Sequence, residues 1–175
     1  SSANFGGVTG NFSIVHDDTL FCQYYDVNNV YRLAKFDGNS ISLVPNPDAT
    51  TYGYWYTPIV YNNKLFILYL PANGKRHLAQ YQSTSNSLSV IPNPDAGSGY
   101  WDQPMVYGDK LYIKYSNAQS RFQLGSFDSN SLQLIANPTG IYNAAAGHNG
   151  YMGYPIILND TLYMQMGSVP LSYTG

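Results

Sequence analysis

A short motif recurs four times along the 175-residue chain, and this internal repeat constrains the fold more than any other feature. Each copy holds a few apolar residues, a polar turn, and a leucine followed by an aromatic residue. The copies occupy residues 13–21, 58–66, 104–112 and 155–163. Their leucines are 45, 46 and 51 residues apart, at Leu20, Leu65, Leu111 and Leu162. Regular spacing of this kind is typical of a fold built from stacked copies of one supersecondary unit.

A second motif alternates with the first, and its copies occupy residues 33–40, 78–81 and 124–131. A Pro-Asn-Pro or Ala-Asn-Pro turn follows each copy. The first motif predicts a hairpin, because the Asp, Asn and Gly pairs at its centre tolerate the positive φ angles of tight turns. The second motif predicts another hairpin, so one repeat holds four strands. We predict the second strand of each repeat at residues 19–25, 64–70, 110–116 and 161–166.

Four antiparallel strands at this spacing are typical of a β-propeller blade. In the second strand of the second repeat, Leu65, Ile67 and Tyr69 share one face, while Phe66 and Leu68 share the other. Both faces are therefore apolar, which suits a sheet packed between two neighbouring sheets. A two-sheet sandwich is the alternative, although it requires no fixed period. We expect the four motif leucines to be buried equivalently.

The repeats are expected to form one propeller segment over residues 1–175, with blades at about 8–47, 54–94 and 100–138 and an incomplete one at 151–175. Because the last blade stops soon after its second strand, we expect a piece of a larger propeller. The alternatives are closure by assembly with copies of the chain and a small four-bladed ring. Open strand edges recruit partners, so the chain alone is expected to be marginally stable or associated with further blades, from the same or another chain.

The composition favours strands and turns over helices. The chain has 18 Tyr, 16 Gly and 10 Pro, and all ten acidic residues are Asp. Tyr favours strands, whereas Gly, Pro and Asp favour turns, so an all-β protein is expected. The net charge of -2 and the lack of a Lys/Arg cluster argue against nucleic-acid binding, and no apolar run is long enough for membrane insertion.

The repeats also resemble those of a known class of proteins. Segments of the form Pro-Asn-Pro-Asp, Gly-Tyr, Pro-Ile-Val-Tyr-Asn-x-Lys-Leu-Tyr and Leu-Ala-x-Phe-Asp-Gly-Asn-Ser-Leu are similar to the tandem β-propeller repeats of large secreted or cell-surface bacterial proteins. Adhesins and other type IX secretion cargo carry such repeats. The resemblance runs from Phe12 to about Met166, with a longer loop at 139–154 in the fourth repeat. It implies an extracellular or cell-surface location and a binding, adhesion or scaffold role.

Catalytic and metal-binding patterns are missing from the sequence. The chain has no Glu for the carboxylate pair of a typical glycosidase, no nucleophile elbow and no zinc-protease motif. Asp48 and Asp95 follow Pro-Asn-Pro turns, where an Asp typically makes a turn hydrogen bond. Residues 37–40 are interpreted as a hairpin turn rather than a calcium loop, and the three histidines lack metal-ligand spacing. We therefore expect no enzyme, no cofactor and no bound metal, and interpret Cys22 as a small core residue.

Aromatic residues gather in the connections that precede the first motif. Gly-Tyr-Trp stands at matching places at 53–55 and 99–101. In a propeller these connections emerge at the same end as the loops that carry the arginines. Aromatic rings beside Arg and Asn suit a sugar, because its C–H face stacks on a ring while its hydroxyls need donors and acceptors. The candidate ligand-binding residues are Tyr54, Trp55, Arg76, Tyr100, Trp101 and Arg121.

The alternative for the two tryptophans is that each packs between blades, so we expect partial burial with one ring edge accessible to a ligand. Three functions remain open. The first is a non-catalytic extracellular binding or adhesion module, with a glycan as ligand. The second is a structural or protein–protein interaction segment of a large surface protein, with another surface protein as partner. The third, which is less favoured, is a hydrolase with an Asp-based site.

Overall fold

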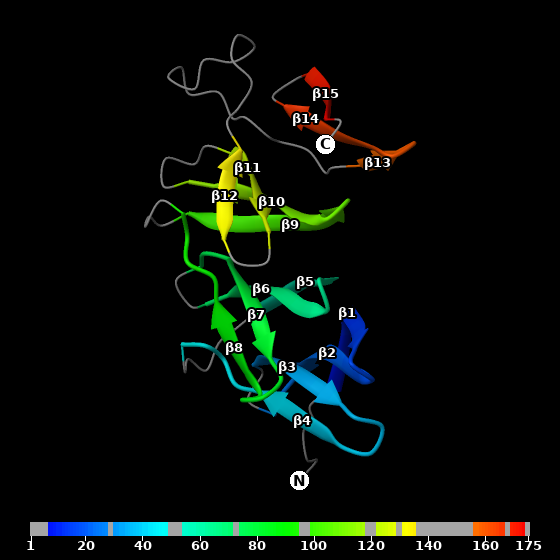
Figure 1. Ribbon diagram of the computed structural model, residues 1–175. Helices are drawn as coiled ribbons and strands as arrows, with labels where there is room; N and C mark the ends of the chain where they lie inside the picture. The colour runs from blue at the N-terminus through cyan, green and yellow to red at the C-terminus, as the bar shows by residue number, and fades with distance from the viewer. Residues whose placement is uncertain are drawn as a thin grey trace. The chain divides into compact units, whose positions relative to one another are not determined.

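The computed structural model describes residues 7–27, 30–48, 54–71, 74–94, 99–117, 122–128, 131–135, 156–166 and 169–173. Every regular element in these ranges is a β-strand, which confirms the all-β prediction, and no helix that could cross a membrane occurs among them. The chain divides into an N-terminal unit that ends at Ile91 and a C-terminal unit that begins at Pro92. Figure 1 shows the strands coloured from blue for β1 to red for β15.

The N-terminal unit contains two antiparallel sheets of four strands each, and in both sheets the strands lie side by side in sequence order. The first sheet consists of β1 (Gly7–His16), β2 (Thr19–Tyr25), β3 (Tyr31–Phe36) and β4 (Ile41–Val44). The second consists of β5 (Tyr54–Tyr61), β6 (Lys64–Leu70), β7 (His77–Gln82) and β8 (Ser87–Val90).

The C-terminal unit contains one sheet of four strands and one of three, again in sequence order. The four-stranded sheet consists of β9 (Tyr100–Tyr107), β10 (Lys110–Ser116), β11 (Phe122–Phe127) and β12 (Leu132–Ile135). The three-stranded sheet consists of β13 (Ile156–Leu158), β14 (Thr161–Met166) and β15 (Val169–Tyr173). The second strands β2, β6, β10 and β14 occupy the predicted residues, so the repeat correctly located every one of them.

The predicted turns have the backbone that tight hairpins require. Both central residues have positive φ in three of the first-motif turns, as type I′ turns demand: 47° and 56° at Asp17 and Asp18, 47° and 53° at Asn62 and Asn63, and 50° and 53° at Asn159 and Asp160. The remaining first-motif turn begins at Gly108, with φ of 59°. Asp and Asn tolerate this left-handed backbone better than other residues with a side chain, so the turn sequences fix where each hairpin reverses.

The first strands of the second and third repeats share a bulge. Pairing shifts register between Tyr56 and Ile59 in β5, and β9 shifts where it pairs with Tyr112 and Lys114 of β10. At each bulge a non-glycine residue has positive φ, 39° at Thr57 and 52° at Gln103. A proline follows each of these residues, and proline, which cannot donate to a strand ladder, is tolerated at bulges.

Face-to-face packing of the two sheets forms the core of the N-terminal unit. We call the face of a sheet that contacts the next sheet its leading face, and the face that contacts the previous sheet its trailing face. Phe21 of β2 meets Tyr81 of β7 edge to face, with ring centroids 4.8 Å apart. The leading face of the β1–β4 sheet contributes Phe12, Ile14, Phe21, Leu33 and Val44. The trailing face of the β5–β8 sheet contributes Val60, Leu65, Ile67, Tyr69, Ala79, Tyr81 and Leu88.

The C-terminal unit repeats this packing. Leu162 of β14, on the trailing face of the β13–β15 sheet, is fully buried against the leading face of the β9–β12 sheet. That face contributes Met105, Tyr107, Tyr112, Phe122, Leu124 and Ile135. In both units, therefore, a motif leucine fills the contact between consecutive sheets.

One motif leucine departs from the prediction of equivalent burial. Leu65, Leu111 and Leu162 are fully buried, whereas Leu20 is partly exposed. The reason is its position rather than its motif, because Leu20 lies on the trailing face of the β1–β4 sheet. Its neighbours on that face include Val15 and Ile41, which are 64% and 56% exposed.

Leu111→Ala should therefore lower the free energy of unfolding by about 2–5 kcal/mol, because it removes a buried side chain and leaves a cavity. Leu20→Ala should cost clearly less in dilute solution, since Leu20 is partly exposed. Urea unfolding of the two variants followed by circular dichroism measures the difference. Equal losses at the two positions would contradict the assignment of Leu20 to an open face.

Candidate functional site

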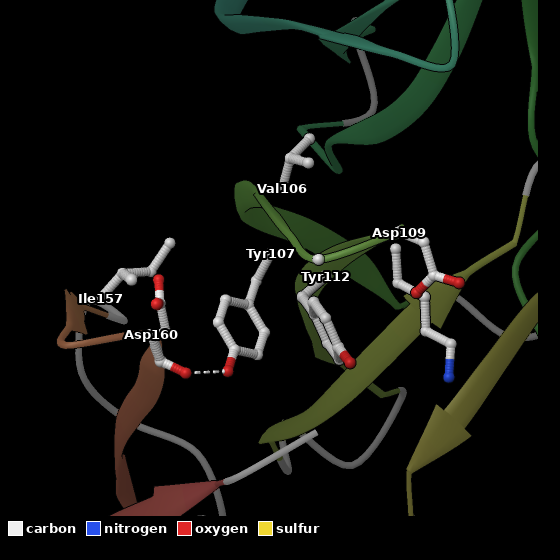
Figure 2. A pocket seen from close by; sticks show the side chains of 8 residues that line it. Val106, Tyr107, Asp109, Tyr112, Ile157 and Asp160 are labelled. Atoms are coloured by element: carbon white, nitrogen blue, oxygen red, sulfur yellow. Dashed lines mark hydrogen bonds between the residues drawn. The ribbon is translucent and has the colours of Figure 1, made fainter.

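A groove of about 560 Å³ lies in the C-terminal unit, between the β9–β10 turn and the β13–β14 turn (Figure 2). We call it the hairpin groove. The β13–β14 hairpin contributes Ile157 and Asp160 to its lining. The β9–β10 hairpin contributes Val106, Tyr107, Gly108, Asp109, Lys110 and Tyr112. The groove therefore lies where the turns of two packed sheets meet.

Two tyrosine rings give the hairpin groove its shape. Tyr112 is 4% exposed and forms the floor, because its ring also belongs to the core between the two sheets. Tyr107 is partly buried, and its ring lies 6.3 Å from that of Tyr112, tilted by 48°. The Tyr107 hydroxyl donates a hydrogen bond of 2.5 Å to the backbone carbonyl of Asp160, drawn as a dashed line in Figure 2. This bond links the two turns and fixes the wall between them.

Charged side chains surround the rings. Asp109, Lys110 and Asp160 are all exposed, and all three line the groove. Two carboxylates and one ammonium group supply hydrogen-bond acceptors and donors around an aromatic floor. The turn sequences put them there, because a tight hairpin turn holds its central residues at the end of the sheet. Such a lining can bind a small polar molecule by stacking and hydrogen bonding together.

Of the aromatic residues predicted to bind a ligand, Trp101 has a side chain that the structure describes. Trp101 has 0% exposure, so the accessible ring edge that we expected is absent. Its ring packs on Tyr115 with centroids 4.3 Å apart, and its indole N–H donates to the Asn93 side-chain oxygen at 2.7 Å. The interpretation of Trp101 as a packed residue is therefore correct for its burial.

Glycine makes this packing possible. Gly99 precedes the Tyr100–Trp101 pair, and a Cβ atom at Gly99 would lie 2.1 Å from the Tyr115 hydroxyl and 2.4 Å from the Ser116 carbonyl. Neither distance is compatible with a side chain. The side-chain amide of Asn93 donates to the Gly99 carbonyl at 3.1 Å, so one asparagine side chain bonds both the Gly99 backbone and the Trp101 indole.

The other candidate residues are only partly described. Arg76 lies over the ring of Tyr56, with the guanidinium carbon 4.7 Å from the ring centroid. The connection before β7 and the first half of β5 therefore meet in the N-terminal unit, as expected for these two loops. The side chains of Tyr54, Trp55 and Tyr100 lie outside the described part of the chain, as does all of Arg121.

Asp48 has a structural partner. The Tyr69 hydroxyl donates a hydrogen bond to the Asp48 carboxylate, and Tyr69 pairs across the strands with His77. Burial lowers the pKa of His77, and the Asp48 charge opposes this shift. The Pro-Asn-Pro-Asp turn is thus fastened to β6 through a buried tyrosine. Asp95, at the matching place in the next repeat, lies outside the described residues.

The two remaining sequence interpretations concern Cys22 and the segment 37–40. Cys22 is 3% exposed in the core, and burial raises the pKa of its thiol. The Asp37 carboxylate accepts the backbone N–H groups of Asn39 and Ser40, each at 2.9 Å, which is a turn and confirms that interpretation. These hydrogen bonds lower the pKa of Asp37. Among the described residues, no three His, Cys or Asp side chains gather as a metal site would require.

The sequence pattern does not predict the hairpin groove. Tyr107 and Tyr112 fit strand positions, and residues 108–109 and 159–160 fit hairpin turns that only connect strands. The available signal was a pair of aromatic residues flanking a turn that contains a carboxylate. Within β9, Tyr107 of the groove and the predicted binding residue Trp101 lie near opposite ends of the strand, roughly 20 Å apart at 3.3 Å per residue.

No protein-family model matches the chain, and no curated protein matches it either. The ligand is therefore inferred from the chemistry of the chain's own surface. In the hairpin groove, aromatic rings, carboxylates and an ammonium group line one space.

Trp101→Ala should lower the free energy of unfolding by about 3–5 kcal/mol, because it removes a fully buried ring and leaves Asn93 without its indole donor. Denaturant unfolding of the variant tests this expectation. Arg76→Ala is the matched comparison in a loop that was also predicted to bind, and it should cost less because Arg76 is partly exposed. A Trp101→Ala variant as stable as the wild type would contradict the structural role.

The stability of the chain should fall as the pH drops below about 6.5, through His77. Because burial holds the pKa of His77 below its ordinary value, the unfolded state takes up the proton first. The contribution is fully present above pH 6.5 and is lost as the pH falls through the pKa of the folded state. Urea unfolding at pH 7.5 and pH 5.5 should show a smaller loss for His77→Gln than for the wild type. The same loss in both proteins would contradict the buried, neutral histidine.

Proposed function

We propose that this protein is a non-catalytic extracellular binding module that takes a neutral carbohydrate in the hairpin groove. The observation that carries the proposal is the lining of that groove. The partly buried Tyr107 supplies ring surface beside Tyr112, which is 4% exposed, while Asp109, Lys110 and Asp160 supply hydrogen-bonding groups around it. A volume of about 560 Å³ is in the range of small-molecule sites.

The chemistry of a sugar fits this lining at two levels. A pyranose ring has an apolar C–H face, which packs against an aromatic ring, and hydroxyls at its edge, which both donate and accept hydrogen bonds. Carboxylates accept from those hydroxyls, and the lysine ammonium donates to them. The floor is already rigid, because Tyr112 is buried among the side chains of two sheets. A preorganised floor reduces the ordering cost of binding.

The charge of the groove favours a neutral or cationic ligand over an anionic one. Two aspartates and one lysine line it, so its formal charge is negative. Phosphates and nucleic-acid backbones would meet net repulsion there, since their binding depends on clustered cations. A neutral glycan meets no such repulsion and can use both signs of charge for its hydroxyls.

We further propose that the four sheets are consecutive blades of a larger β-propeller in a secreted or surface protein, with the further blades supplied by the same or another chain. Sequential strand order within each sheet and face-to-face packing of consecutive sheets support this architecture. The resemblance of the repeats to those of adhesins and type IX secretion cargo supports the location. The two observations are independent, because one comes from strand pairing and the other from sequence.

A second candidate function is a structural or protein-interaction segment of the same large protein. It is favoured by the apolar side chains that remain exposed on two sheets, Val15 and Ile41 on one and Ile156 and Leu158 on the other, each at least 56% exposed. Soluble proteins seldom leave such clusters open unless a partner covers them.

A glycan array followed by calorimetric titration tests the carbohydrate proposal. Lys110→Ala and Asp109→Ala should each weaken binding of the selected glycan by about tenfold, equivalent to about 1.4 kcal/mol, because each removes hydrogen bonds to it. Folding stability should change by no more than about 0.5 kcal/mol, since both side chains are exposed. Tyr107→Phe keeps the aromatic ring and removes the hydroxyl that donates to the Asp160 carbonyl, so it tests whether this hydrogen bond is needed for glycan binding.

Lys64→Ala is the matched control for Lys110→Ala, because Lys64 holds the same place after the β5–β6 turn and does not line the groove. It should leave glycan affinity unchanged. If both groove variants bind the glycan as tightly as the wild type, the binding site is not the hairpin groove. If no glycan on the array binds, the structural or protein-interaction function is favoured. Cleavage of any glycan in the panel would overturn the non-catalytic assignment.

A further inference from the structure

The two sheet contacts inside the chain follow one rule. In each unit the leading face of the earlier sheet packs on the trailing face of the later sheet. Leu65 and Leu162 lie on the trailing faces of these contacts, whereas Phe21 and Tyr112 lie on the leading faces. The same type of contact is therefore made twice, with the same motif positions on each side.

On the trailing face of the first sheet, the small residues Cys22 and Ala34 are 3% and 0% exposed, whereas larger apolar side chains around them stay accessible among the described residues. Strand pairing places Val15 opposite Leu20, Leu20 opposite Phe36, and Phe36 opposite Ile41, so one apolar row crosses all four strands. Leu43 lies beside this row, opposite Ala34. Val15, Ile41 and Leu43 are 64%, 56% and 44% exposed.

The corresponding row in the second sheet is covered. Val60 pairs with Leu65, and Tyr81 pairs with Leu88, at the same positions of the repeat. There Leu65 is 0%, Tyr81 8% and Leu88 7% exposed, under the leading face of the first sheet. The open row on the first sheet thus has the composition of a surface that this chain elsewhere buries.

The last sheet has the complementary defect, an open leading face. Ile156 pairs with Tyr163 on this face, and Ile156 and Leu158 are 59% and 56% exposed. Ile14 in the first sheet and Met105 in the third sheet occupy the motif position of Ile156. Both pack against the neighbouring sheet. The described part of the last sheet therefore presents exposed apolar side chains at the positions that form a leading face in the earlier sheets.

We propose that a second copy of this chain covers these faces, with the leading face of the β13–β15 sheet of one copy packed on the trailing face of the β1–β4 sheet of the next. Each open face is one half of a contact that the chain already makes twice, so the complement of each face is present on another copy. Both halves are apolar, and the charged Arg32 on the trailing face is already ion-paired with Asp26 at 3.1 Å.

This contact is head-to-tail rather than two-fold symmetric, because two different surfaces meet. Such contacts close into rings when the rotation between copies permits and otherwise extend into filaments. Copies should therefore associate in steps beyond a dimer. A symmetric pairing of two first sheets, by contrast, would stop at two copies.

Two double variants test the proposal on the full chain. Ile41→Lys with Leu43→Lys blocks the trailing face, and Ile156→Lys with Leu158→Lys blocks the leading face. All four side chains are exposed, so folding should be little changed, which circular dichroism verifies. Sedimentation velocity over a range of concentrations should show association of the wild type, and each double variant alone should be monomeric.

Mixing the two double variants is the decisive step. Each retains one intact face, so the equimolar mixture should form a one-to-one dimer and grow no further, and this complementation also shows that both variants fold. Val27→Lys changes a side chain that is 60% exposed in the turn after β2, away from both rows, and should associate like the wild type. If a double variant loses its β-strand circular dichroism spectrum, the single variants Leu43→Lys and Ile156→Lys are used instead. Each should raise the dissociation constant for self-association at least tenfold.

Three results would overturn the proposal. A wild-type chain that stays monomeric at every concentration would mean that no second copy covers the faces. Dimers formed by the leading-face variant alone would indicate symmetric pairing of first sheets. Monomers that persist in the mixture of folded variants would show that the two open faces do not recognise each other.

Discussion

Strands β6 and β10 carry large side chains on both of their faces, and the rest of the fold depends on keeping both faces dry. In β6, Leu65, Phe66, Ile67 and Leu68 all have 0% exposure. Leaving either face in water would cost free energy in proportion to the apolar area exposed. Backbone hydrogen bonds are satisfied by neighbouring strands within the sheet, so the two faces are available for packing. A strand of this composition is therefore stable only where other side chains cover both of its faces.

Stacking confines polar chemistry to the ends of the strands. Side chains on the two faces are committed to the cores, so donors and acceptors for a ligand must come from turns and connections. The hairpin groove follows from this division. Tyr107 is the last residue of β9, and from there its hydroxyl reaches the Asp160 carbonyl in the turn of the next sheet. Two turns of packed sheets thus form a site that neither hairpin could form alone.

The repeat predicted the strands and turns because these depend on local sequence. A leucine after an Asp or Asn pair fixes both the turn and the first buried residue of the following strand, so β2, β6, β10 and β14 could be located without a structure. Exposure of Leu20 could not be predicted in this way, because it depends on what covers the sheet. The motif is the same at all four leucines, and the surroundings differ.

The burial of Trp101 shows a second limit. Trp101 and Val106 are five positions apart, so simple alternation would put them on opposite faces of β9. The bulge at Gln103 adds one residue to the count, and both residues end up opposite β10 side chains of one face, Trp101 opposite Tyr115 and Val106 opposite Leu111. A bulge of this kind leaves little trace in a sequence beyond the proline that follows it. The face of every residue before the bulge is therefore decided by one backbone angle.

Tyr112 takes part both in the packing between two sheets and in the lining of the groove, which elsewhere in the fold are tasks of different residues. Asp109 and Lys110 are exposed, so they can change without disturbing the core, and the chain has Asn63 at the position of Asp109 in its second hairpin and Thr19 at the position of Lys110 in its first. Tyr112 has no such freedom, because it floors the groove and also packs with Leu124 and Leu162 between the sheets. A ligand seated on this ring binds only the packed arrangement of the two sheets. A ligand that binds the groove as proposed would therefore stabilise the contact between the β9–β12 and β13–β15 sheets by mass action.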